Sequence, residues 1–87
     1  MKTDKPHKLH GKRPAVITEA MRSFYTEVGN QIRSERKRFN MSQTDLARLL
    51  SLTRVSVTNI ERGKHFPSLW QIRVMKINGF IFTGVAL

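Results

Sequence analysis

The segment from Ser42 to Pro67 constrains the fold more than any other part of the chain. It contains two short runs of helical spacing, separated by a turn of only a few residues. In the first run Leu46, Ala47 and Leu50 fall on one helix face. Ala47 is informative because two helices that cross at about 90 to 120° over a short turn need a small side chain near the crossing. The segment therefore predicts a pair of tightly crossed helices.

Polar residues and a glycine mark the ends of this helix pair. Ser42 can cap the first helix, and Asp45 three residues later places an acid where the helix dipole favours one. Thr53 can cap the second helix, and Gly63 ends it. Leu52 is expected to point inward from the turn between them.

The second helix of the pair has an outer face that packing does not explain. Val57 and Ile60 are three residues apart and face the core. The remaining side chains then point mostly toward solvent: Arg54, Val55, Ser56, Thr58 and Asn59. This is the layout of a helix pair that reads DNA.

These residues resemble the helix-turn-helix family of lambdoid phage repressors and Cro, often called XRE-like. The resemblance covers roughly Val28 to Met75 and includes the runs IRSERKRFNMSQTDLA and LTRVSVTNIERGK and a Pro-Ser-Leu helix start. The positions at the family's spacing are Gln43, Leu46, Ala47, Ile60, Glu61, Gly63 and Pro67. One departure lies in the turn, where the family usually has Gly and this chain has Ser51. A left-handed Ser51 would cost about 1 kcal/mol relative to Gly, which the turn should survive.

The resemblance implies a recognition helix in the major groove, with the preceding helix against the DNA backbone. Arg54 can bond guanine, Asn59 can bond adenine, and Val55 can pack on a thymine methyl group. The expected base-reading residues are Arg54, Val55, Ser56, Thr58 and Asn59. The expected phosphate contacts are Gln43, Thr53, Arg62 and Lys64. Glu61 is expected to support the fold, because a carboxylate would repel phosphate.

Charge and length point in the same direction. Sixteen Lys and Arg against six Asp and Glu give a formal charge of +10, which favours a polyanionic partner such as nucleic acid. A chain of 87 residues allows one small domain of modest stability, which dimerisation would help. The longest uncharged run, 77–87, is about half the length that spans a bilayer, and no signal peptide is evident. We expect a cytoplasmic protein that associates with the nucleoid when bound to DNA.

The sequence offers little for catalysis or metal binding. There is no cysteine, so a metal site would have to use His7, His10 or His65 with carboxylates, and a chance pairing of the first two is the better explanation. Serine-histidine-aspartate, glycine-rich phosphate-loop and HExxH patterns are missing. We therefore expect no catalytic residues, no metal and no cofactor.

The predicted fold is all-α, a compact four- to five-helix repressor-like DNA-binding domain. A flexible, disordered basic arm (1–21) precedes the helix-turn-helix domain (22–76), and an apolar tail follows (77–87). The first helix should run from about Phe24 to Phe39, with Asn40 as its stop, and the last should begin at Pro67–Ser68. Inward residues of these two helices should be Phe24 or Tyr25, Val28, Ile32, Phe39, Leu69, Ile72 and Met75.

Two segments keep open alternatives. The basic cluster Arg33, Arg36, Lys37 and Arg38 is either a solvated helix face or a phosphate contact, and the basic arm is either a solubilising tail or a source of salt-sensitive affinity. Residues 80–87 prefer strand over helix. They could pair across a dimer, fold onto their own domain in place of a fifth helix, or form a truncated end. The lone Trp70 is expected to be a packing residue.

The leading hypothesis is a bacterial or phage regulator of transcription, of the repressor type, that binds double-stranded DNA as a homodimer. The alternative is a protein-interaction module, such as an antitoxin that binds a cognate toxin, with DNA binding secondary. RNA binding is disfavoured because aromatic stacking platforms and GxxG loops are absent.

Overall fold

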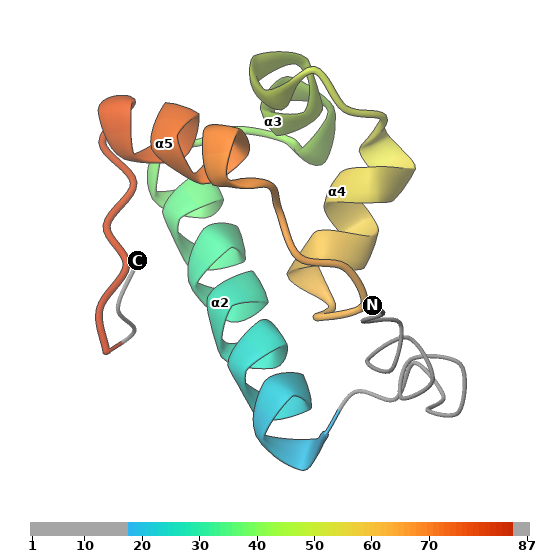
Figure 1. Ribbon diagram of the computed structural model, residues 1–87. Coiled ribbons are helices and arrows are strands. Elements are labelled where there is room, and N and C mark those ends of the chain that lie inside the picture. Colours follow the sequence, from blue (N-terminus) through green and yellow to red (C-terminus); the bar gives the residue numbers. More distant parts are fainter. Residues whose placement is uncertain (1–17, 85–87) are drawn as a thin grey trace, which may run out of the picture.

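The computed structural model describes residues 18–84, and all the regular structure within that range is helical (Figure 1). Helix α4 packs against both α2 and α3, and α5 packs against α3. The expected all-α fold is confirmed. The four helices are α2 (Glu19–Arg38), α3 (Gln43–Leu50), α4 (Arg54–Glu61) and α5 (Leu69–Ile77).

Helix α2 begins earlier than its hydrophobic spacing predicts. The Thr18 side chain accepts a hydrogen bond from the Met21 backbone N–H at 3.1 Å and caps the helix. Residues 19–21, which were expected in the basic arm, are therefore the first turn of α2, and the rest of the arm lies outside the described residues. The helix ends where expected, because Asn40 adopts a left-handed conformation with φ 58°.

The helix pair forms as its capping residues predict. Ser42 and Asp45 exchange two hydrogen bonds, each from the backbone N–H of one residue to the side chain of the other, at 2.9 and 3.0 Å. Ser51 takes the left-handed conformation with φ 59° and ψ 44°. The Leu52 backbone N–H then donates to the Ala47 carbonyl at 2.8 Å and closes the turn. The turn accepts serine, at a cost of about 1 kcal/mol relative to glycine.

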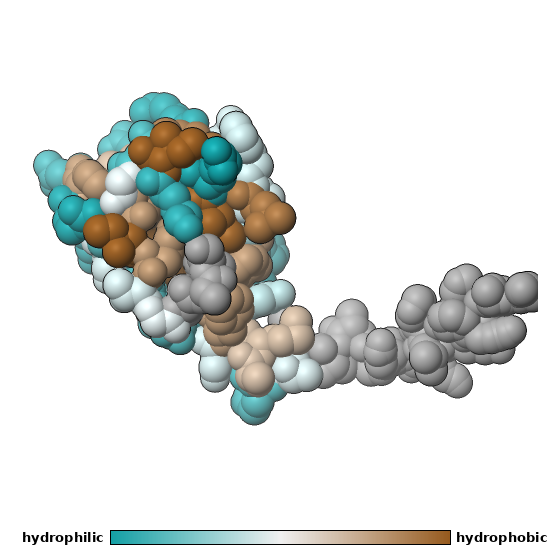
Figure 2. Space-filling model, turned by 60° about the vertical axis from the view of Figure 1, so that its left-hand side comes forward, coloured by the Kyte–Doolittle hydropathy of each residue, from teal (hydrophilic) through white to brown (hydrophobic). Residues whose placement is uncertain are grey.

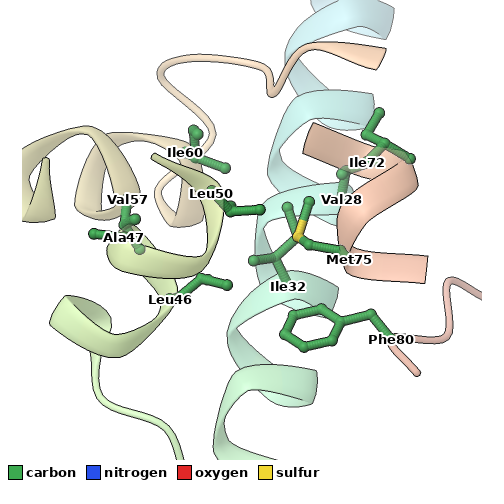
Figure 3. Close-up of a cluster of buried hydrophobic side chains, with 10 residues drawn as sticks. All are labelled: Val28, Ile32, Leu46, Ala47, Leu50, Val57, Ile60, Ile72, Met75 and Phe80. Carbon is green, nitrogen blue, oxygen red and sulfur yellow. The ribbon is translucent and has the colours of Figure 1, made fainter. Parts of the chain in front are cut away.

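The core lies where α2, α3, α4 and α5 meet (Figure 3). Three predictions about packing are wrong. Trp70, which was expected to be a packing residue, is 68% exposed. Leu69 is 84% exposed, because Ser68 and Gln71 form a capping box that sets the register of α5 with Ile72 and Met75 inward. Phe39 is also exposed. The buried apolar residues are Val28, Ile32, Leu46, Ala47, Leu50, Val57, Ile60, Ile72, Met75 and Phe80.

The described part of the tail, residues 80–84, has no regular secondary structure and pairs with no strand in the described chain. Phe80 is buried and stacks on Phe39 with ring centroids 5.6 Å apart. Farther along, the Thr83 backbone N–H donates to Gln31 Oε1 at 2.7 Å, and Gln31 Nε2 donates to the Thr83 carbonyl at 2.5 Å. Of the three alternatives, the described residues agree with folding onto their own domain.

Two further contacts hold the tail against α2. Arg38 donates to the Gly79 carbonyl at 3.0 Å, and the Ile81 backbone N–H donates to Glu35 Oε1 at 2.9 Å. The side chains of Gln31, Glu35 and Arg38 lie on one face of α2 by their helical spacing. The described tail therefore covers this face of α2.

Candidate nucleic-acid interface

The position of α4 is set by a close approach to α2. A Cβ atom on Gly29 would lie 2.4 Å from the carbonyl oxygen of Ile60 and 2.8 Å from that of Glu61. Only a glycine at this place in α2 lets the two helices come so near. Val57 and Ile60 are buried on the inner face of α4, as predicted. The packing therefore fixes which side of α4 faces outward.

The five predicted base-reading residues lie on α4 with different exposure. Arg54 is exposed, and Val55 is 60% exposed although it is apolar. Ser56, Thr58 and Asn59 are half-buried. Two of these take part in local hydrogen bonds. The Ser56 backbone N–H donates to the Thr53 side chain, and its hydroxyl lies 3.0 Å from that of Thr53. The Thr58 hydroxyl donates to the Arg54 carbonyl at 3.1 Å.

A buried ion pair lies behind the recognition helix. Arg36 Nε donates to Glu61 Oε2 at 2.6 Å, and Arg36 Nη2 donates to Glu61 Oε1 at 3.1 Å. Arg36 Nη1 also donates to the Met41 carbonyl at 2.9 Å. Both alternatives for Arg36, a solvated face and a phosphate contact, are therefore wrong. Glu61 was expected to support the fold, and it does so by pairing with Arg36.

Gln43 connects this buried pair to the outer face of α4. Its Nε2 donates to Glu61 Oε1 at 3.1 Å. Its Oε1 accepts from Thr58 Oγ1 at 2.9 Å and from Arg54 Nη1 at 3.3 Å. An ionised carboxylate only accepts hydrogen bonds, so Glu61 fixes the amino end of the Gln43 amide and turns the oxygen toward α4. The side chain predicted to contact phosphate is engaged within the protein.

A polar hollow of about 370 Å³ opens above this network. Three exposed arginines, Arg33, Arg54 and Arg62, line it, whereas Glu61 compensates the charge of Arg36. The hollow therefore carries excess positive charge in a concave surface, where an anion is favoured. Arg33 was only one member of the basic cluster in the sequence, and the structure brings it beside Arg54 and Arg62.

A protein-family model described as a helix-turn-helix domain matches residues 27–75. The chain belongs to this helix-turn-helix family. The match fits the XRE-like resemblance and indicates a DNA-binding regulator. Such families are typically non-enzymatic. A comparison with curated proteins finds no match.

The loop that follows the helix-turn-helix is held against α2. Phe66 stacks on Phe24 and Tyr25, with ring centroids 5.5 and 5.1 Å apart. Gly63 has φ 78° and lies so close to Thr26 that an added Cβ would be 2.8 Å from its Oγ1. The predicted helix stop at Gly63 is confirmed. Lys64 is exposed at the start of this loop, outside the polar hollow.

The part of the helix-turn-helix chain that the structure describes contains no group of three or more His, Cys, Asp or Glu side chains able to hold a metal. His7 and His10 lie outside the described residues. None of the described helices is long and apolar enough to cross a membrane.

Proposed function

We propose that this protein is a sequence-specific, double-stranded-DNA-binding regulator of transcription, of the repressor type, and not an enzyme. In this proposal α4, residues 54–61, enters the major groove. The observation that carries it is the exposed outer face of α4 beside the arginine-lined hollow, in a helix-turn-helix domain. A cytoplasmic, nucleoid-associated location belongs to the same proposal.

Direct reading of bases is assigned mainly to three side chains. Arg54 lies in the first turn of α4, where the hydrogen bond to Gln43 limits its orientations, and its guanidinium can bond guanine O6 and N7. Val55 exposes an apolar side chain that can contact a thymine methyl group. Asn59 can bond adenine N6 and N7. Ser56 and Thr58 supply adaptable contacts, because a hydroxyl can both donate and accept hydrogen bonds. Both hydroxyls also have partners within the protein.

Phosphate contacts are assigned on both sides of the groove. Arg62 and Lys64 follow α4, and Arg33 on α2 lines the hollow together with Arg62. Thr53 caps α4 and Gln43 begins α3, at helix ends where the first backbone N–H groups have no intrahelical partner. Since the Gln43 side chain is engaged with Glu61, its contact with phosphate would use the backbone N–H.

The active unit in this proposal is a homodimer. A two-fold pair of helix-turn-helix domains reads two half-sites about one helical turn apart, so the operator should be palindromic. Selection from a pool of randomised duplexes tests the proposal as a whole. It should return a palindromic motif, and recovery of random sequence at physiological salt would contradict sequence-specific binding.

A further inference from the structure

The outer face of α5 carries three exposed, large apolar side chains. Leu69 is 84% exposed, and Trp70 and Ile77 are each 68% exposed. Leu69, Arg73 and Ile77 are spaced by four residues and so follow one another along one helix face. A shallow groove of about 380 Å³ runs along it, lined by Leu69, Ile72, Arg73, Lys76 and Ile77. The side of the molecule that includes α5 and the tail shows brown apolar side chains set among teal hydrophilic ones (Figure 2).

The described chain does not cover this face. Ile72 and Met75 occupy the core side of α5, and the tail leaves the helix at Gly79 and runs along α2 past Glu35 to Gln31. Apolar groups gathered on a surface and rimmed by polar ones are typical of a protein-binding site. Trp and Arg are also the residue types that dominate binding energy in such sites.

The size of the face favours a small occupant. Three apolar side chains offer roughly half of the ~800 Å² per partner that a stable protein interface commonly buries. A groove of this kind suits a single amphipathic helix, which places apolar side chains at every third or fourth position into it.

The charge of the face favours an acidic occupant. Arg73 lies in the middle of the groove, and α5 contains no acidic residue. Two acids on other elements are already bound within the domain, Glu35 to Arg38 and Glu61 to Arg36. A second copy docked by two-fold symmetry would place the same acid-free face against itself and would offer Arg73 no carboxylate from that face.

We propose that the outer face of α5 binds an acidic amphipathic helix of a partner protein. Apolar side chains of that helix pack between Leu69 and Ile77 and against Trp70, and a carboxylate pairs with Arg73. The groove shares no residue with the arginine-lined hollow beside α4. Partner and DNA can therefore be bound at the same time, which would let the protein act on transcription through a second protein.

Trp70 is the only tryptophan in the chain, so its fluorescence reports directly on this face. The probe is a synthetic helical peptide of about 14 residues, or four turns, with leucines at every third or fourth position and glutamates beside them. Its docking should shift Trp70 emission to shorter wavelength and saturate. A peptide of the same composition in scrambled order, and one with lysine in place of glutamate, should bind about tenfold more weakly or worse.

Variants of the full chain separate docking from simple charge attraction. The Leu69→Ser/Ile77→Ser double variant keeps every charge and should lose about tenfold in affinity for the acidic peptide. Ile81→Ser, at an exposed isoleucine outside the groove, is the matched control and should bind as the parent does. Arg73→Glu should reverse the preference and favour the lysine peptide.

Three results would overturn the proposal. Equal binding of the scrambled peptide would mean attraction by charge alone. A concentration-dependent blue shift of Trp70 without peptide, accompanied by dimerisation in sedimentation and lost in Leu69→Ser/Ile77→Ser, would assign the face to a second copy. A red shift on deleting residues 85–87 would assign it to the chain's own end. The Leu69→Ser/Ile77→Ser variant should bind duplex DNA as the parent does. The α5 proposal can therefore fail while the DNA-binding proposal stands.

Discussion

At the scale of single residues, Arg54 and Lys64 should differ in what their loss does to DNA recognition. Arg54→Ala should weaken binding to the preferred site by about 1 to 3 kcal/mol and relax the choice at one base pair, because a bidentate contact to a base is lost. Lys64→Ala should weaken all duplexes alike and reduce the salt slope by about one unit for each chain of the dimer, because phosphate contacts carry no base information. Selection on randomised duplexes measures both. If the two variants returned the same motif with the same information content, α4 would not enter the groove as proposed.

The buried pair predicts a large effect of one carboxylate on stability. Glu61→Ala leaves Arg36 buried without its partner, which should lower the free energy of unfolding by about 3 to 5 kcal/mol. Arg48→Ala is the control, since its ion pair with Asp45 is exposed and 3.6 Å long and should be worth less than about 1 kcal/mol. Thermal and denaturant unfolding measure both changes. Equal stability of the two variants would show that Arg36 finds another partner.

At the scale of helices and segments, the tail is predicted to contribute to the core. Phe80 is 4% exposed, so Phe80→Ala should cost about 3 to 5 kcal/mol through lost burial and the cavity left behind. Ile81→Ala, one residue later on an exposed side chain, should change stability by less than about 0.5 kcal/mol. Denaturant unfolding of the two variants measures both changes. If Phe80→Ala were as stable as the parent, the tail would contribute nothing to the stability of the core.

Attachment of the tail to α2 should weaken in acid. The Arg38 hydrogen bond, and after it the Ile81 backbone N–H, hold the pKa of Glu35 below its usual range. A lowered folded-state pKa contributes stability above the unfolded pKa, and that stability is lost as pH falls through the folded value. Hydrogen exchange at the Ile81 amide should therefore lose protection below about pH 4. Glu35→Gln should remove this pH dependence, and an unchanged profile would exclude Glu35 as its cause.

Local signals in the sequence predicted the helix pair well, because capping is a matter of neighbouring residues. Ser42 with Asp45, Thr53 with Ser56 and the left-handed Ser51 all act within a few residues of their partners. Partners far apart in sequence were missed. Arg36 and Glu61 are separated by 25 residues, and only the fold shows that they meet. The same holds for the tail, whose strand preference is overridden by contacts with α2.

At the scale of the whole molecule, charge and stability are linked through DNA binding. A small domain is marginally stable, and a ligand that binds only the folded state adds stability in proportion to the logarithm of its excess concentration. A chain with a formal charge of +10 also repels itself, and bound phosphates relieve that repulsion. We therefore expect the free protein to be less stable than its complex with DNA, in which phosphates balance the positive charge.

The last prediction concerns salt. If each chain of a dimer neutralises about three to five phosphates, the logarithm of the binding constant should fall with the logarithm of salt concentration with a slope on the order of −5 to −9. Deleting residues 1–13, which carry Lys2, Lys5, Lys8, Lys12 and Arg13, should flatten the slope and weaken all duplexes alike. Titrations of parent and truncated protein on the selected operator and on unrelated duplex measure this. A loss confined to one operator position would mean that the arm reads bases in the minor groove, and a slope near zero for the parent would remove the electrostatic basis of the proposed function.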